Sequence, residues 1–370
     1  MAGQRRMRGK NSRNGCRVPR EEPVWWYGET RQITARALEP LARLYGAIAV
    51  SRFTDTLPYR SKLPVICIGN FTAGGTGKTP FAISIAERLK AMGERPVFLT
   101  RGYGGSAKGP LWVDGQRHTA RETGDEPLLL VRTAPTLIAR NRRAGAAYIE
   151  THGDKASVIV MDDGLQNPSL AKDLTLVVVD AKRGLGNERV IPAGPLRAPL
   201  DFQLRLANVI VLNDSATAVQ RFAAFEQRLR RAYQGPIIQA SLEPARDAEW
   251  LKGAEVSAYA GIANPQRFFD FLQWLGASVS ARTVFRDHQQ LTEADARRLL
   301  AGAEASGLLL VTTEKDWARL PASGTGALAA LKAKSRVLAV RSAVEPQDEP
   351  KLEALLRNAL AQHRAGRSGL

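Results

Sequence analysis

A glycine-rich loop followed by a lysine and a threonine is the stretch of this sequence with the clearest capacity for chemistry. The loop occupies residues 69–77, and Lys78 and Thr79 follow it directly. Glycines let backbone N–H groups converge on a phosphate chain, a lysine can reach the β- and γ-phosphates, and a threonine hydroxyl can bind Mg²⁺. The pattern predicts a phosphate-binding loop for a nucleotide. Its expected binding residues are Gly74, Gly75, Thr76, Gly77, Lys78 and Thr79, and Lys78 is also expected to act in catalysis.

The segments on either side of this loop have the character that it requires. Residues 65–68 are an apolar, β-branched run typical of a buried parallel strand, and residues 81–90 have helical apolar spacing. Thr72 replaces the first glycine of the full pattern, and Ala73 stands where nitrogenase-reductase-like ATPases carry a second lysine, which disfavours that subclass. A chance Gly-Lys-Thr in an ordinary turn is the alternative, and the flanking strand and helix argue against it.

Two adjacent carboxylates indicate a metal site. The apolar run 156–161 ends in Asp162 and Asp163. A strand that ends in acid resembles the Mg²⁺-binding motif of phosphate-loop enzymes, and neighbouring carboxylates repel unless a cation lies beside them. We therefore expect Thr79, Asp162 and Asp163 to bind Mg²⁺. The alternative is a surface turn.

The composition of the chain limits the classes of protein to which it could belong. It has 370 residues, a net charge of +17, 44% apolar residues and two cysteines. Two cysteines cannot form a disulfide framework, and no run of about 18 or more apolar residues could span a membrane. The positive charge favours an anionic partner. Aromatic residues are only 6% and no nucleic-acid-binding motif accompanies the charge, so a membrane ranks above nucleic acid.

The N-terminal region is predicted to contact that membrane. Residues 1–20 contain seven Lys and Arg and no acid, which predicts a disordered basic tail. A segment of helical spacing follows Trp25, Trp26 and Tyr27. Its apolar stripe consists of Ile33, Ala37, Leu41, Leu44 and Ile48. Aromatic, apolar and basic residues in this arrangement suit a helix in a membrane interface, with Pro40 kinking it or starting a second helix. The alternative is a helix packed on the protein's own core.

The order of the expected strands and helices predicts an α/β fold. It is P-loop NTPase-like, with a doubly wound, mostly parallel sheet and a second, smaller α/β domain. The expected parts are a basic tail (1–23), a membrane-associating amphipathic segment (24–58), a kinase core (59–232), the smaller domain (233–345) and a C-terminal helix and tail (346–370). Asn213, Asp214 and Ser215 follow a further strand and break the Asn-Lys-x-Asp pattern of guanine-specific proteins, which favours an adenine nucleotide.

Several further residues could act in chemistry, each with a structural alternative. Asp125 precedes an apolar helix and could cap it, and His288, one of four histidines, could be structural. Tyr103 lies in a glycine-rich loop that could be a simple connector. Arg142 opens a helix and could belong to a solvated basic face.

Taken together, these motifs resemble the tetraacyldisaccharide 4'-kinase family, the lipid A 4'-kinases of Gram-negative bacteria. The similarity covers roughly residues 24–345, about the whole globular chain. The segments that carry it are 69–70, 74–80, 101–104, 124–127, 162–166, 192–197, 287–288 and 313–316.

The resemblance implies a reaction and a location. ATP would phosphorylate the 4'-hydroxyl of a tetraacylated glucosamine disaccharide 1-phosphate to give lipid IVA, at the cytoplasmic face of the inner membrane, where the enzyme would be peripheral. No nucleic acid and no obligate protein partner are expected. The alternative is a membrane-associated ATPase acting as a switch or assembly factor without a small-molecule acceptor.

The resemblance also implies roles for the candidate residues. Lys78, Thr79, Asp162 and Asp163 would bind ATP and Mg²⁺, and Asp125 and His288 would form an acid–base pair acting on the acceptor hydroxyl. Tyr103, Arg142 and Arg197 would contact phosphate or sugar, although Arg140 and Arg143 compete with Arg142 for that role.

Overall fold

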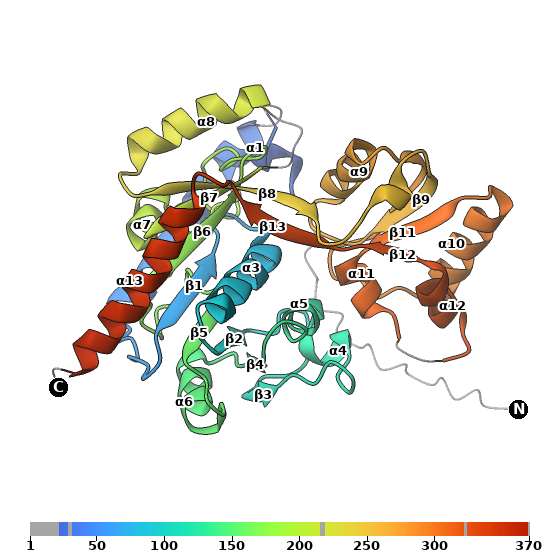
Figure 1. Ribbon diagram of the computed structural model, residues 1–370. Helices are drawn as coiled ribbons and strands as arrows, with labels where there is room; N and C mark the ends of the chain where they lie inside the picture. Colours follow the sequence, from blue (N-terminus) through green and yellow to red (C-terminus); the bar gives the residue numbers. More distant parts are fainter. Residues whose placement is uncertain (1–21, 29–31, 215–218, 322–323, 369–370) are drawn as a thin grey trace, which may run out of the picture.

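The computed structural model describes residues 22–28, 32–214, 219–321 and 324–368, which form two β-sheets with helices packed against them (Figure 1). Most of the predicted basic tail therefore lies outside the described residues. Within them, no helix is long and apolar enough to cross a membrane.

The larger sheet has nine strands, and its seven central strands are parallel. The edge strands β13 and β3 pair antiparallel with their neighbours. In spatial order the strands are β13 (Val340–Val344), β8 (Ile237–Pro244), β7 (Val209–Asp214), β6 (Leu174–Asp180), β1 (Val65–Gly69), β5 (Val158–Asp162), β2 (Pro96–Thr100), β4 (Thr136–Ile138) and β3 (Leu111–Trp112). The strand that precedes the phosphate loop is thus at the centre of the sheet.

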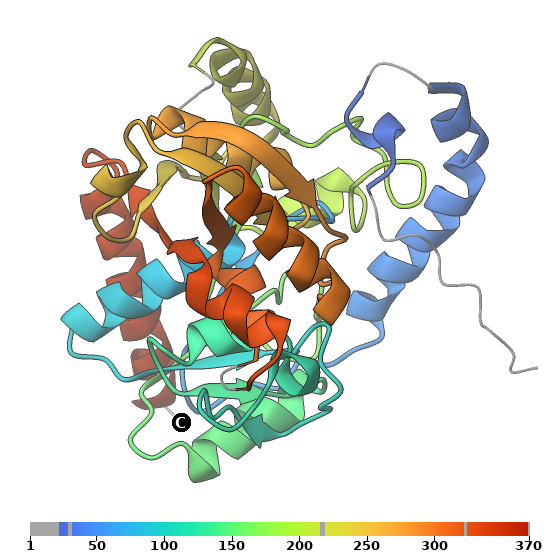
Figure 2. The same ribbon diagram turned by 90° about the vertical axis from the view of Figure 1, so that its right-hand side faces the viewer.

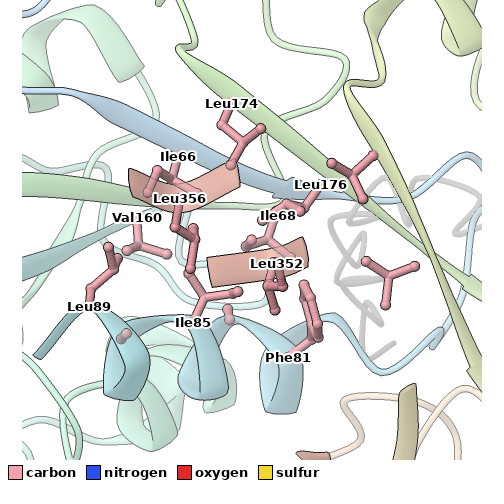
Figure 3. Close-up of a cluster of buried hydrophobic side chains, with 14 of the residues drawn as sticks. Ile66, Ile68, Phe81, Ile85, Leu89, Val160, Leu174, Leu176, Leu352 and Leu356 are labelled. Atoms are coloured by element: carbon pink, nitrogen blue, oxygen red, sulfur yellow. The ribbon is translucent and has the colours of Figure 1, made fainter. Parts of the chain in front are cut away.

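Helices cover both faces of this sheet, so the doubly wound fold is confirmed. Helices α3 (Lys78–Ala91) and α13 (Glu349–Ser368) pack on one face, where Phe81, Ile85 and Leu352 meet alternate residues of the central strands (Figure 3). Helices α6 (Arg142–His152), α7 (Leu200–Leu206) and α8 (Val219–Ala232) cover the other face. Residues 65–69 are buried on both sides, which explains why their sequence is continuously apolar. The short helices α4 (Ala120–Thr123) and α5 (Asp125–Leu130) lie between β3 and β4 in the chain.

The smaller sheet has four strands in the order β10-β9-β11-β12, all parallel. Its strands are β9 (Glu255–Ala260), β10 (Ser278–Val284), β11 (Leu309–Thr313) and β12 (Arg336–Leu338). Its helices are η2 (Glu249–Leu251), α9 (Pro265–Trp274), α10 (Glu293–Ala305), α11 (Glu314–Arg319) and α12 (Ala327–Lys334).

The expected domain boundaries differ from this arrangement. Residues 233–345 were assigned to the smaller domain, but β8 and β13 belong to the nine-stranded sheet and pair with each other (Figure 1). The smaller domain is therefore inserted between these two strands. Helix α13 returns to the larger sheet, where Leu352 and Leu356 join the same buried cluster as Phe81.

The N-terminal region forms the 3₁₀ helix η1 (Val24–Trp26) and the helices α1 (Gln32–Ala37) and α2 (Glu39–Thr54), at the edge of the molecule in Figure 2. The helix breaks at Leu38, and Pro40 lies in the first turn of α2, as expected. Small residues face the protein, namely Ala35, Ala42 and Gly46.

The predicted apolar stripe is exposed. Ile33 is 82% exposed, Leu41 56% and Leu44 60%. Packing of the stripe on the protein's own core, the alternative considered above, is therefore wrong. Trp26 corrects the membrane prediction in one respect. Trp26 is buried and its indole N–H donates to the carbonyl of Pro192 at 3.1 Å, so it belongs to the protein's interior.

Candidate active site

The phosphate loop joins the end of β1 to the start of α3. Gly77, at the N-cap of α3, has φ 89°, a conformation that favours glycine. A Cβ atom there would also collide with the Asn213 side chain, whose amide donates to the carbonyl of Thr76 at 2.8 Å. Asn213 comes from the end of β7, which is separated from β1 by β6, and so holds the loop from two strands away in the sheet. This role was not predicted from the sequence, which suggested only a link to the choice of base.

Lys78 and Arg197 meet at one carboxylate. Lys78 Nζ lies 3.7 Å from Asp163 Oδ1, and Arg197 Nη1 donates to the same oxygen at 2.8 Å. Burial alone would raise the pKa of Asp163, but the charges of Arg197 and Lys78 outweigh burial and hold this pKa well below its usual range. Burial lowers the pKa of Lys78. The arrangement provides two cations where phosphate oxygens would bind.

Asp162, unlike Asp163, has no hydrogen-bonded cation at its carboxylate among the described residues. It is 1% exposed, and neither carboxylate oxygen has a hydrogen-bond partner in the described part of the chain. Burial, with the nearby charges of Glu126 and Asp163, raises its pKa to about 7. An unpaired buried carboxylate is costly unless it meets a cation or a proton.

The residues present fit a magnesium ion held together with nucleotide phosphates. Thr79, Asp162 and Asp163 follow two adjacent strands, and all three are oxygen donors of the kind Mg²⁺ prefers. Among the described residues no group of three or more His, Cys, Asp or Glu could hold a metal alone. Mg²⁺ in such enzymes needs only one or two carboxylates because phosphates and waters complete its shell.

Asp125 and His288 are brought together across the two domains, as the resemblance implied. His288 Nδ1 lies 3.0 Å from Asp125 Oδ1. The helix-cap alternative for Asp125 is wrong, because Gly124 occupies the N-cap of α5 and Asp125 is its first helical residue. The other ring nitrogen of His288, Nε2, is 3.5 Å from a carboxylate oxygen of Asp287. His288 itself has φ 59°, unusual for a non-glycine residue.

Arg319 is the residue of this cluster that the sequence reading missed. Its Nε donates to Asp125 Oδ2 at 3.1 Å, and its Nη2 bonds the same oxygen. Its Nη1 donates to Asp316 at 2.8 Å. Arg319 belongs to α11, one turn beyond Lys315, so the motif at 313–316 pointed to the right helix. No sequence signal identified which arginine would meet Asp125.

These partners determine the charges of the pair. Burial would raise the pKa of Asp125, but the hydrogen bond from His288 and the charge of Arg319 outweigh it and hold this pKa well below its usual range. Burial would lower the pKa of His288, but the hydrogen bond and charge of Asp125 raise it overall. The carboxylate therefore stays ionised and the imidazole is a stronger base than an isolated one.

Further ion pairs join the same two helices. Lys315 Nζ lies 2.6 Å from Glu126, and Arg132, just after α5, lies 3.4 Å from Glu314. With Arg319 and Asp125 they make three interdomain pairs between α11 and the α5 region. The position of His288 relative to the phosphate loop thus depends on this contact.

One cavity of about 680 Å³ connects the two regions. The predicted residues that line it are Gly74, Gly75, Thr76, Gly77, Lys78, Thr79, Tyr103, Arg142, Asp163, Arg197 and His288. Asp125 and Asp162 do not line it. Asp125 lies behind His288, with both of its oxygens already bonded. The imidazole is therefore the member of the pair that faces the cavity.

The candidate arginines and Tyr103 lie in different surroundings. Arg142 is buried, donating to the carbonyl of Ala139 at 2.7 Å, so the solvated basic face is wrong for this residue. Arg140 also lines the cavity, whereas Arg143 lies over the ring of Tyr59. Tyr103 packs edge-on against His288, with ring centroids 5.2 Å apart.

Fold and site together define a phosphate-loop nucleotide enzyme of the kinase type, in which an Asp–His pair joins the larger domain to the smaller one. The family model for tetraacyldisaccharide-1-P 4'-kinase matches residues 34–361, and the chain belongs to this family.

Relatives with this name are similar over most of their length. The tetraacyldisaccharide 4'-kinase of Nitrobacter winogradskyi is 45% identical over 81% of this chain and 87% of its own. That of Methylobacterium sp. strain 4-46 is 45% identical over 94% of this chain and 99% of its own. A crystal structure of LpxK from Aquifex aeolicus in complex with ATP aligns with a TM-score of 0.68 at 26% identity, covering 88% of this chain and 99% of that one.

Proposed function

We propose that this chain is an ATP-dependent kinase that phosphorylates the 4'-hydroxyl of a tetraacylated glucosamine disaccharide 1-phosphate, giving lipid IVA for lipid A biosynthesis. The observation that carries the proposal is that a nucleotide phosphate loop and His288, which is bonded to Asp125 behind it, line one cavity in a member of this family. Membership of the family indicates the acceptor. The geometry of the site supports the proposed roles of the residues in phosphoryl transfer.

In the proposed reaction, the acceptor oxygen forms a bond to the γ-phosphorus while the bond from that phosphorus to the β–γ bridging oxygen breaks, and ADP leaves. His288 receives the hydroxyl proton, and Asp125 orients the ring and balances its new charge. Lys78 and Arg197 stabilise the charge on the transferring group. Mg²⁺, held by Thr79, Asp162 and Asp163, would supply further neutralisation of phosphate charge.

A transfer assay tests this proposal. Purified protein would receive γ-labelled ATP with and without the disaccharide monophosphate, and thin-layer chromatography would follow the label. A kinase transfers the label to the glycolipid and consumes little ATP without it. Steady ATP hydrolysis without transfer would instead support the switch alternative.

We also propose that the exposed stripe on α1 and α2 places the enzyme on the cytoplasmic face of an anionic membrane. Leu41 and Leu44 lie exposed, with Arg36, Arg43 and Arg52 exposed on the same helices. Exposed apolar residues beside cations suit an interfacial helix. The cavity reaches this helix at Tyr45, Ala49, Arg52 and Phe53. A lipid acceptor could thus place its sugars in the cavity and its acyl chains along α2.

Vesicle flotation tests the membrane proposal. The double variant Leu41→Asp/Leu44→Asp should bind phosphatidylglycerol vesicles at least about 10-fold more weakly. Two leucines that become buried in the bilayer on binding contribute about 3 kcal/mol or more. Binding by the unaltered protein should weaken with salt. The control is Val284→Asp, an exposed apolar residue (59%) on the smaller domain. Equal loss in both variants, or no loss in either, would place the contact elsewhere.

A further inference from the structure

Arg267, on helix α9 of the smaller domain, extends to the phosphate loop of the larger one. It lines the same cavity, and its Nη1 lies 4.0 Å from the position that a Cβ atom of Gly77 would take. Ala263, just before α9, comes as close as 3.5 Å to the corresponding position at Gly75. The smaller domain therefore covers the phosphate loop at this point.

The guanidinium of Arg267 has more donors than its protein partner uses. Its Nη1 donates to Asp180 Oδ2 at 3.1 Å, and its side chain is only 13% exposed. Its Nε and Nη2 are buried without a hydrogen-bond partner among the described residues. Leaving buried donors of a charged group unpaired destabilises the protein. A ligand with several acceptor oxygens would remove that penalty.

The side of the loop on which Arg267 lies indicates which oxygens it meets. In the sheet, β1 lies between β5 and β6. Asp163 follows β5, and Lys78 and Arg197 contact its carboxylate there, so the γ-phosphate and Mg²⁺ are expected on that side. Asp180 ends β6, so Arg267 lies on the opposite side of the loop. A phosphate chain across the first turn of α3 would present its α- and β-phosphates there.

We propose that Arg267 binds the diphosphate portion of ATP and stabilises the charge that develops on departing ADP. The inference rests on the proposed ATP binding. When the bond to the γ-phosphorus breaks, the electron pair stays on the β-phosphate oxygen, and a fixed guanidinium beside it lowers the barrier. Because Arg267 comes from the smaller domain, bound nucleotide would join the two domains directly.

Nucleotide binding measured by isothermal titration calorimetry tests the proposal, with AMPPNP, ADP and adenosine as probes. Arg267→Ala should weaken AMPPNP and ADP at least about 10-fold, because charge-assisted hydrogen bonds to phosphate are lost, and should leave adenosine within about twofold. Arg267→Lys, which keeps the charge beside Asp180, should lose less. Arg282→Ala is the control, since Arg282 lies over Phe269 on the same domain and does not line the cavity.

A second variant separates phosphate binding from a purely structural role. Arg267→Ala removes the ion pair of Asp180, whose other oxygen keeps the backbone N–H donors of Lys182 and Arg183, and that carboxylate could itself repel phosphate. The double variant Arg267→Ala/Asp180→Asn removes the repulsion and should still bind ADP at least about 10-fold more weakly than Asp180→Asn alone.

Recovery of ADP affinity in the double variant, equal weakening of adenosine, or unchanged affinities in Arg267→Ala would overturn the proposal. If the unaltered protein bound AMPPNP no better than adenosine, the proposed ATP binding would fail as well.

Discussion

The phosphate loop and the cluster of Asp125, His288 and Arg319, which meets the same cavity through His288, are assembled differently. The loop is a single continuous segment between β1 and α3. The cluster joins Asp125 to His288, 163 positions away, and to Arg319, 194 positions away. The loop needs only the larger sheet to form, whereas the cluster needs both domains in contact. Nucleotide binding and acceptor chemistry can therefore be disturbed separately.

Two buried carboxylates, Asp125 and Asp162, also differ in how their charge is balanced. Asp125 has permanent partners on both oxygens, and these hold its pKa below the usual range. Asp162 has none among the described residues, and its pKa rises to about 7. One carboxylate is kept ionised by the protein itself, while the other is left for a cation brought with the nucleotide.

The largest effect is expected at the interdomain cluster. Asp125→Asn keeps the shape of the side chain but removes the charge that orients and strengthens the imidazole base. It should lower kcat by ~10²–10⁴ while leaving ATP affinity nearly unchanged, and it should also lower the melting temperature, because Arg319 loses the charge of its buried partner. Steady-state kinetics, calorimetry and melting curves check this. Normal turnover, or activity lost only in step with stability, would remove Asp125 from the mechanism.

A substitution at Lys78 should affect the transferring phosphoryl group rather than the base that accepts the proton. Lys78→Ala removes a cation from the transferring phosphoryl group and should lower kcat by ~10² or more. Lys90→Ala, at the other end of α3, is the control. Near-normal rates in Lys78→Ala at saturating ATP would contradict the assignment of the phosphate loop.

The pH dependence should report on His288. Its pKa is raised above the ordinary value of 6.5, and only the neutral ring can accept a proton. Activity should therefore fall about tenfold per pH unit below that raised pKa. In Asp125→Asn the hydrogen bond and the charge that raise this pKa most are gone, and burial opposes the remaining effect of Asp287, so the residual activity should persist to lower pH. If activity falls at the same pH in the unaltered protein and in Asp125→Asn, a group other than His288 causes the loss at low pH.

Arg319 should have the smallest effect of the four. Arg319→Lys keeps a charge beside Asp125 but loses the paired hydrogen bonds. We expect kcat to fall about tenfold with ATP affinity unchanged. Arg298→Lys, an exposed pair with Asp295, is the control. A fall in ATP affinity of the same size would mean that the interdomain contact also shapes the nucleotide site.

The same contrast determines what the sequence could predict. The loop, its strand and its helix are contiguous, so glycines, Lys78 and apolar spacing identified them. The position of Asp162 and Asp163 at the end of a strand was predicted because a strand ending in acid is also a local pattern, and their binding of Mg²⁺ stays a prediction. Arg319, Arg267 and Asn213 were missed because their partners are set by tertiary contacts that no local spacing encodes.

The domain boundary was misplaced for a related reason. The apolar pattern of residues 237–240 predicts a strand but does not say which sheet it joins. Likewise, the side of α2 that carries large apolar residues lies outward, while small residues such as Ala42 and Gly46 pack inward. The helical spacing predicted the apolar stripe correctly, but it could not show which side of the helix contacts the protein.

A double-mutant cycle on Asp125 and His288 tests the central claim, that the two residues act as one unit on the acceptor hydroxyl of a glycolipid kinase. The measurement is kcat for transfer of the γ-phosphate to the disaccharide monophosphate by Asp125→Asn, His288→Ala and the double variant. If they act together, the double variant should be within about tenfold of the slower single variant. Independent penalties that multiply, with ATP affinity unchanged throughout, would contradict the account.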